Sequence, residues 1–324
     1  MISRPNHVRW QSESDLKIVA LGGGHGLAAT LSALRRLPTN LTGVVTVADN
    51  GGSSGRIRDE LGGLPPGDLR MALAALCGDD EWGRTWADVL QHRFSSGGAL
   101  DGHVVGNLLI AGIWDLMGEG VDGLDLVGQL LGAQGRVLPM ASIPLSIGAD
   151  VCLDASPGEL TRVTGQVEVA STEGHVVNVW LEPNDPPACP EAVAAIDAAD
   201  WVVIGPGSWF TSVIPNLLVP GLRKALARTS AKRILVLNLG EQEGETLGLS
   251  PEGHLEVLAS HAPELHFDYV LADTGMVDEA GILVSAAKSI GAELISVHVS
   301  KGPGSVLHDP LRLAAAFHQI MVQA

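Results

Sequence analysis

Cysteine, basic residues and long apolar runs are all scarce in this sequence. The 3 cysteines, Cys77, Cys152 and Cys189, stand too far apart for a disulfide framework or a paired-cysteine zinc site. The 20 basic residues face 37 acidic ones, and the net charge of −17 argues against a nucleic-acid partner. No stretch stays apolar long enough to cross a bilayer, and residues 1–15 are too polar for a signal peptide, so we expect a cytoplasmic protein without a membrane span.

The 324 residues, of which 46% are hydrophobic, are enough to bury a large core. We expect residues 1–15 to form a polar tail and residues 16–324 a single α/β domain. Short apolar runs alternate with helix-length segments, which predicts a mostly parallel sheet with helices on both faces. The expected strands are residues 16–21, 41–48, 201–204, 233–237, 269–271 and 294–299.

Two segments interrupt the alternation of strands and helices. Residues 81–133 read as two or three helices with a glycine-rich link at 95–98, and we expect them to form a helical cap. Residues 136–182 carry β-branched alternation at 161–164 and 175–180, separated by glycine-containing turns. They predict a small antiparallel β insertion.

Polar, glycine-rich loops follow several of the expected strands. Because ligands bind beyond the carboxyl ends of parallel strands, we expect these loops to meet at one edge of the sheet. The loops are residues 22–26, 49–56, 205–212 and 238–246.

The first loop is suited to a phosphate. Its glycines allow close approach of the backbone, and the helix expected after it directs free N–H groups at an anion. His25 is either a phosphate donor or a capped loop histidine, and both readings stay open. The candidate ligand-binding residues here are Gly22, Gly23, Gly24, His25 and Gly26.

The second loop carries side chains that suit a phosphorylated ligand. Hydroxyl groups can donate hydrogen bonds, Arg56 can form a fork on a phosphate, and Asp49 can hold a metal or a hydroxyl. Asp68 and Arg70 could complete this wall, although an N-cap at Asp68 and a solvated helix face at Arg70 are equally good interpretations. The candidates are Asp49, Asn50, Gly51, Gly52, Ser53, Ser54, Arg56, Asp68 and Arg70.

Three further groups complete the predicted site. His103 and Asn107 stand one helical turn apart and could contact ligand hydroxyls, or His103 could be a structural histidine. The loop after residues 201–204 contributes Gly205, Pro206, Gly207, Ser208, Thr211 and Asn216, and the loop after 233–237 contributes Asn238. The acidic residues Glu241, Glu243 and Glu245 could bind a metal, but we interpret Glu241 and Glu243 as solvated.

Other functions match parts of the same loops. Residues 24–29 satisfy the GxGxxA pattern of dinucleotide folds, with Asp49 where a ribose-binding acid would lie. That reading is weakened because Asp49 leads into another glycine-rich loop. Residues 51–55 formally match a hydrolase nucleophile elbow, but the serine does not directly follow the strand. No Gly-Lys pair occurs, which excludes a Walker A loop.

These blocks together resemble the gluconeogenesis-factor family, the YvcK-type UDP-sugar-binding proteins, which are related to the CofD-type 2-phospholactate transferases. The resemblance spans about residues 17–309, and its motifs occur in family order. It rests on residues 22–26, 45–56, 65–68, 102–107, 205–219 and 244–246.

The resemblance implies a Rossmann-like core and binding of a UDP-sugar such as UDP-N-acetylglucosamine. It also implies a regulatory role that links carbon metabolism during gluconeogenic growth to cell-wall synthesis and cell shape. No reaction is established for this branch, whereas the CofD-type relatives use a metal and a nucleotide-activated three-carbon acid to phosphorylate a deazaflavin alcohol. We also expect a homo-oligomer, namely a dimer.

Three positions depart from the family pattern. His25 replaces a usual threonine, Asn50 replaces the second of two aspartates, and residues 240–243 replace a Met-Thr-Gln segment. A neutral amide at Asn50 is a poorer ligand for a divalent cation, which weakens the case for a metal. For a nucleotide binder the candidate cofactor is Mg²⁺ with the nucleotide, and Asp49 is its candidate ligand. These departures favour a UDP-sugar binder, with a metal-dependent transferase or an NAD-binding oxidoreductase as alternatives.

Overall fold

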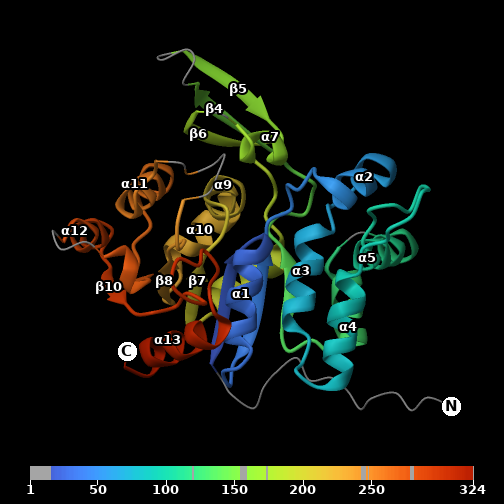
Figure 1. The fold of residues 1–324 in the computed structure, drawn as a ribbon, viewed down its shortest axis with the longest axis horizontal. Helices are drawn as coiled ribbons and strands as arrows, with labels where there is room; N and C mark the ends of the chain where they lie inside the picture. Colours follow the sequence, from blue (N-terminus) through green and yellow to red (C-terminus); the bar gives the residue numbers. More distant parts are fainter. Residues whose placement is uncertain are drawn as a thin grey trace.

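The computed structural model describes residues 16–323 except 119, 154–158, 173, 242–245, 247 and 278–280, so the predicted tail at 1–15 lies outside the described residues. A parallel sheet forms its centre (Figure 1). This sheet has 7 strands in the order β10-β9-β8-β7-β1-β2-β3. The chain leaves β1 toward β2 and β3 and returns on the other side of β1 at β7, which is the doubly wound, Rossmann-like order. The α/β prediction is therefore confirmed. The strands are β1 (Lys17–Gly22), β2 (Asn40–Val45), β3 (Arg136–Pro139), β7 (Trp201–Ile204), β8 (Lys232–Val236), β9 (Tyr269–Ala272) and β10 (Glu293–Ser296).

The central strands and the first helix pack closely. Ile18, Ala20 and Leu21 of β1 are fully buried, as expected for a strand covered on both faces. In α1 (Gly24–Leu34) the buried Leu31 lies against β2, where a Cβ added to Gly43 would lie 3.1 Å from Leu31 Cδ1. The glycine therefore lets α1 lie close to the sheet.

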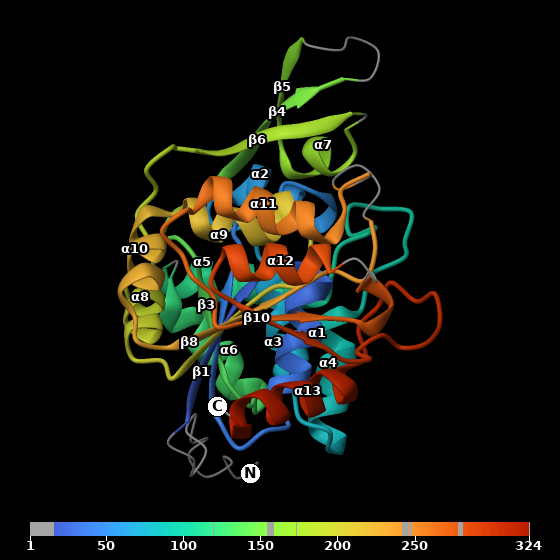
Figure 2. The same ribbon diagram turned by 90° about the vertical axis from the view of Figure 1, so that its left-hand side faces the viewer.

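Helices cover both faces of the sheet (Figure 2). On one face α1 packs against α3 (Gly67–Leu76) and α13 (Pro310–Gln323). On the other face α8 (Pro190–Asp197) packs against α10 (Pro220–Arg228). The remaining helices of the second half are α9 (Ile214–Leu218), α11 (Pro251–His261) and α12 (Ile282–Ser289). Among the described residues, no helix is both long enough and apolar enough to cross a membrane.

The helical cap forms as predicted. It consists of α4 (Glu81–Gln91), α5 (Val105–Met117) and α6 (Val121–Leu131). Helix α4 begins at Asp80, whose carboxylate accepts a hydrogen bond of 2.7 Å from the Gly83 N–H. The glycine-rich link at 95–98 joins α4 to α5.

The β insertion is shorter than the predicted 136–182. Residues 136–139 form β3, which pairs in parallel with β2 and belongs to the main sheet, because Val137 and Leu138 are buried there. The insertion itself contains β4 (Ser146–Cys152), β5 (Leu160–Thr164), β6 (His175–Glu182) and the short helix α7 (Gln166–Ala170). Its antiparallel sheet, in the order β5-β4-β6, projects from the end of the molecule above α1 (Figure 1).

Several predicted boundaries are wrong. The strand expected at 41–48 ends at Val45, and the one expected at 294–299 ends at Ser296. The second glycine-rich loop becomes helical at Gly52, where α2 (Gly52–Leu61) begins. The third loop ends at Ser208, because residues 209–213 form the π-helical turn η1 (Trp209–Val213) before α9.

Candidate functional site

The described residues of the four polar loops meet at one edge of the sheet, as predicted. They follow β8, β7, β1 and β2, which are consecutive neighbours in the sheet. The turns after β1 and β7 touch: a Cβ added to Gly26 would lie 2.5 Å from Gly207 Cα and would collide with the Pro206 carbonyl. They flank the point where the strand order reverses, which is the crevice where doubly wound sheets bind ligands.

The first turn places a helix N-terminus at this crevice. Gly23 is the N-cap of α1, and Gly24 adopts a φ of +54°, a conformation that favours glycine. The Gly24 N–H donates a hydrogen bond to the Asp68 carboxylate. A Cβ added to Gly23 would lie 2.5 Å from Asp68 Oδ2, so the glycine leaves room for that carboxylate.

Asp68 therefore has a role that the sequence did not predict. The N-cap interpretation of Asp68 is wrong, because Pro66 occupies the N-cap position of α3 and Asp68 lies in the first turn. Its carboxylate bonds across to α1 instead of capping its own helix. An anionic side chain thus already interacts with the amides that we assigned to a phosphate.

Asp49, Asp68 and Arg70 form a charged cluster, in which the two aspartates are half-buried and Arg70 is buried. Asp49 accepts a hydrogen bond of 2.8 Å from the Gly51 N–H and another from the Ser54 hydroxyl. Burial raises the pKa of Asp68 to about 7, with repulsion from Asp49 as the second cause, and burial also raises the pKa of Asp49. Arg70 interacts with both carboxylates and hydrogen-bonds Gln91, so the interpretation of Arg70 as a solvated residue is wrong.

This pair suits a partly hydrated divalent cation better than a protein-only metal site. Among the described residues, no group of three or more His, Cys, Asp or Glu side chains could hold a metal ion. Two carboxylates such as Asp49 and Asp68 fit Mg²⁺ that keeps waters or ligand phosphates. Asn50 does not contribute, because its amide bonds Glu168 at 2.9 Å and the Val167 N–H at 3.1 Å. Of the acidic cluster at 241–245, only Glu241 lies within the described residues.

A second polar cluster centres on the buried Ser53. Its hydroxyl lies 3.2 Å from His103 Nδ1 and accepts hydrogen bonds from the Val104 N–H at 3.1 Å and the Asn107 amide at 3.2 Å. His103 and Asn107 do converge, but they do not share one helix, because α5 begins at Val105. The buried Asn107 Oδ1 has no hydrogen-bond partner in the structure.

Arg56 is engaged elsewhere. Its guanidinium is exposed and donates to the carbonyls of Asp101 at 2.6 Å and Ala99 at 2.7 Å. It therefore secures the link between α4 and α5, and the arginine that faces the two carboxylates is Arg70.

Two asparagines join the loops: Asn238 joins the fourth loop to the third, and Asn216 of α9 joins the third to Thr46, which follows β2. The Asn238 side chain accepts the Gly207 N–H at 2.9 Å and donates to the Gly207 carbonyl at 2.8 Å. The Asn216 amide donates to Thr46 Oγ1 at 3.0 Å and to the Ser212 carbonyl at 2.8 Å. Thr46, which sequence reasoning missed, also bonds the Gly22 carbonyl, so it links three loops. Thr211 is buried in η1.

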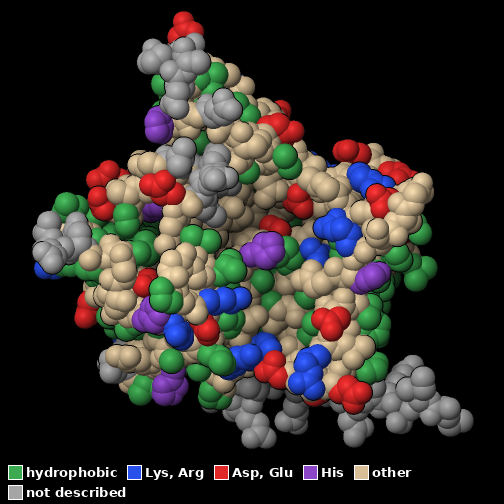
Figure 3. All heavy atoms as spheres, viewed as in Figure 1, with side chains coloured by type: hydrophobic (Ala, Val, Ile, Leu, Met, Phe, Trp, Pro, Cys, Tyr) green, Lys and Arg blue, Asp and Glu red, His purple; other side chains and the backbone are tan. Residues whose placement is uncertain are grey.

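A pocket of about 660 Å³ lies beside these turns, within the range of small-molecule sites. Figure 3 shows this face of the molecule hollowed in its middle, below the projecting β insertion. The predicted residues that line the pocket are His25, Gly26, Pro206, Gly207 and Asn238. The exposed side chain of His25 therefore contributes to a pocket wall.

The pocket also has a wall that sequence reasoning missed. Residues 301–310, which follow β10, contribute Lys301, Val306, Leu307, His308 and Pro310. The Gly302-Pro303-Gly304 sequence was the available signal, since it marks one more loop after an expected strand.

Known proteins share this architecture. The sequence profile of the family described as 2-phospho-L-lactate transferase CofD matches residues 18–299. A putative gluconeogenesis factor of Mycobacterium leprae is 55% identical over 309 residues, which cover 94% of this chain and 86% of that protein. The gluconeogenesis factor of Halalkalibacterium halodurans is 39% identical over 244 residues, 75% of this chain and 73% of that one.

A solved structure agrees with these relatives. The crystal structure of a member of the UPF0052 family from Bacillus halodurans superimposes with a TM-score of 0.84 at 31% sequence identity. The match covers 94% of this chain and 99% of that one. Fold, sequence and the strand-end turns therefore agree, and the chain belongs to the CofD family, among its gluconeogenesis factors.

Proposed function

We propose that this protein is a regulator that binds a UDP-sugar, such as UDP-N-acetylglucosamine, at the crevice between β1 and β7. The observation that supports this most is the contact between the Gly22–Gly26 and Gly205–Ser208 turns at the reversal of strand order. The amides at the start of α1 that Asp68 leaves free would bind the diphosphate, and the adjoining pocket would take the remainder of the ligand. The bound state would link gluconeogenic metabolism to cell-wall synthesis and cell shape.

Calorimetry tests this proposal. UDP-N-acetylglucosamine, UDP-glucose, GDP and NAD would be titrated into the protein with and without Mg²⁺. We expect saturable binding of the uridine ligands, and NAD binding without any uridine binding would contradict the proposal. Gly97→Ala, in the link between α4 and α5 where an added Cβ meets open space, is a matched control for changes in the glycine turns.

A metal-dependent transferase is the second candidate, because two half-buried carboxylates interact with each other at the crevice. Asp49 and Asp68 would hold Mg²⁺ with the ligand phosphates, and the metal would stabilise charge on a transferred phosphoryl or nucleotidyl group. Asp49→Asn would then abolish product formation but leave metal-free binding largely intact. Binding without turnover in the unaltered protein favours the regulator.

An NAD-dependent oxidoreductase is less well supported. In such enzymes a carboxylate after the second strand binds the ribose hydroxyls. Here Asp49 lies beyond the end of β2, and its carboxylate already accepts hydrogen bonds from Gly51 and Ser54.

We further propose that the protein acts in the cytoplasm as a dimer. Leu116 and Met117 at the end of α5 are 84% and 51% exposed, and they offer an uncharged surface to a second copy of a chain with net charge −17. Light scattering after size-exclusion chromatography tests this, with Leu116→Glu expected to shift the mass to that of a monomer.

A further inference from the structure

The segment after β10 forms a compact wall of the pocket. Ser300 and His308 face each other in an isolated antiparallel bridge, and the Lys301 N–H donates to the Leu307 carbonyl at 2.9 Å. The side of the closed loop that carries Lys301, Leu307 and His308 lines the pocket, together with Ala28 and Ala29 of α1.

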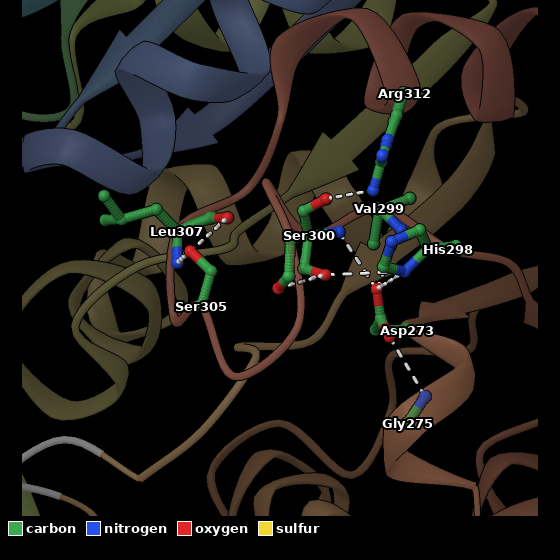
Figure 4. Close-up of polar contacts among 9 residues, drawn as sticks. Asp273, Gly275, His298, Val299, Ser300, Ser305, Leu307 and Arg312 are labelled. Atoms are coloured by element: carbon green, nitrogen blue, oxygen red, sulfur yellow. Dashed lines mark hydrogen bonds and ion pairs between the residues drawn. The ribbon is translucent and has the colours of Figure 1, made fainter.

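Asp273, at the end of β9, holds this wall in place (Figure 4). Its Oδ2 accepts the N–H groups of Val299 at 2.8 Å and Ser300 at 2.9 Å, and its Oδ1 accepts the Gly275 N–H at 3.0 Å. Arg312 of α13 donates to the Ser300 carbonyl at 2.6 Å. The wall is therefore fixed by hydrogen bonds within the chain.

The same cluster is not a catalytic triad. Ser300 Oγ lies 3.4 Å and Asp273 Oδ2 3.2 Å from His298, but both approach the same ring nitrogen, Nδ1. A triad histidine uses one nitrogen for the acid and the other for the nucleophile. The cluster therefore positions the loop.

His308 is a polar side chain of this wall with one ring nitrogen that lacks a partner. It is only 8% exposed, and its buried Nε2 has no hydrogen-bond partner in the structure. Burial lowers the pKa of His308 to about 4, although a hydrogen bond to the Leu237 backbone opposes that shift. The ring is therefore neutral at pH 7, and a ring that donates to the Leu237 carbonyl presents Nε2 as an acceptor.

We propose that His308 Nε2 accepts a hydrogen bond from a sugar hydroxyl on the part of the ligand that extends beyond the diphosphate. This inference rests on the proposed function. It names His308 as the side chain that distinguishes a nucleoside diphosphate, or its sugar conjugate, from free pyrophosphate. A buried acceptor without a partner costs free energy, so a ligand that supplies the matching donor gains affinity over one that does not. The hydroxyl belongs either to the ribose or to the second sugar.

Titrations with three probes test the proposal. Pyrophosphate, UDP and UDP-N-acetylglucosamine are titrated into the unaltered protein, His308→Phe, His308→Gln, and the control His318→Gln on the exposed face of α13. We expect His308→Phe to lose about 10-fold in affinity for UDP-N-acetylglucosamine and nothing for pyrophosphate. His308→Gln, which keeps an acceptor oxygen, retains most of the affinity, and His318→Gln binds normally.

The outcomes separate the two proposals. A loss already seen with UDP assigns the hydroxyl to the ribose, and a loss confined to UDP-N-acetylglucosamine assigns it to the second sugar. Unchanged affinity of His308→Phe for all three probes overturns the role of His308 while the proposed function stands. No uridine binding by the unaltered protein overturns the proposed function itself. If the variants do not fold, nitrogen NMR of the unaltered protein decides, because the His308 Nε2 resonance must shift with the sugar-bearing probe and not with pyrophosphate.

Discussion

The carboxylate of Asp68, in the first turn of α3, accepts a hydrogen bond from the backbone N–H of Gly24 in the first turn of α1. This half-buried carboxylate thereby joins the first turns of α1 and α3 beside the crevice. A phosphate that enters the crevice would lie near this carboxylate. The charge of Asp68 therefore affects both the stability of the fold and the binding of a ligand.

Stability should depend on pH through Asp68. Its pKa is raised from 3.8 to about 7 by burial and by Asp49, so the folded state holds the proton more tightly than the unfolded state. The associated stability is fully present below pH 3.8 and is lost as the pH rises through about 7. Asp68→Asn should therefore be about 1–3 kcal/mol more stable than the unaltered protein at pH 8, and much closer to it at pH 5.

Urea unfolding at both pH values measures this difference. Asp59→Asn, an exposed carboxylate on α2, is the matched control and should change little at either pH. A difference for Asp68→Asn that is the same at pH 5 and pH 8 would contradict the assigned pKa.

The contact between the first and third turns should be intolerant of a side chain. Gly26→Ala places a Cβ against the backbone of Pro206 and Gly207, which cannot move aside as a flexible side chain could. We expect a loss of about 1–3 kcal/mol in the free energy of unfolding and weaker binding of UDP-N-acetylglucosamine. Thermal melting should show the loss for Gly26→Ala and none for Gly97→Ala, and equal melting of the two variants would refute the close approach.

The two hydrogen bonds between Asn238 and Gly207, here called the clamp, should increase ligand affinity. Asn238→Ala removes both hydrogen bonds to Gly207 and frees the third turn to move relative to the first. We expect affinity for UDP-N-acetylglucosamine to fall about 10-fold by calorimetry. Asn178→Ala in the β insertion, where the amide lies 3.4 Å from an Asp150 oxygen, serves as the control. Full affinity in Asn238→Ala would show that this clamp does not shape the site.

Asp273 should hold the pocket wall through its negative charge. Burial alone would raise the pKa of Asp273, but hydrogen bonds from Gly275, Val299 and Ser300 outweigh that cause and bring the pKa to about 2. Its contribution to stability is therefore present above pH 3.8 and is lost as the pH falls toward 2. Asp273→Asn should unfold about 1–2 kcal/mol more easily at pH 7.

Hydrogen exchange locates this effect. The Val299 and Ser300 amides should exchange faster in Asp273→Asn, whereas Asp115→Asn on the exposed side of α5 should leave them protected. Unchanged protection at Val299 in Asp273→Asn would mean that other contacts hold the wall.

Local pattern predicted the larger elements well. Apolar periodicity predicts the buried strand Trp201–Ile204 and the helix that begins at Gly24. The periodicity is present because a strand in a sheet, or one face of a helix, must be apolar to be buried. Glycines that end a strand and begin a helix also marked the first turn. The short strand Arg136–Pro139 joins the main sheet because it pairs with β2. Its own residues do not predict this pairing, since β2 lies about 90 residues away in the chain.

The sequence by itself determined the alternation of strands and helices, the glycine turns and the family, because these depend on neighbouring residues and their order. Only the tertiary structure decided that Asp68 bonds α1, that Asn50 and Arg56 are bound to other segments, and that His308 lines the pocket. Those outcomes depend on which distant segments pack together. A polar side chain forms hydrogen bonds with the groups that the fold brings within about 3 Å of it, and burial favours such pairing.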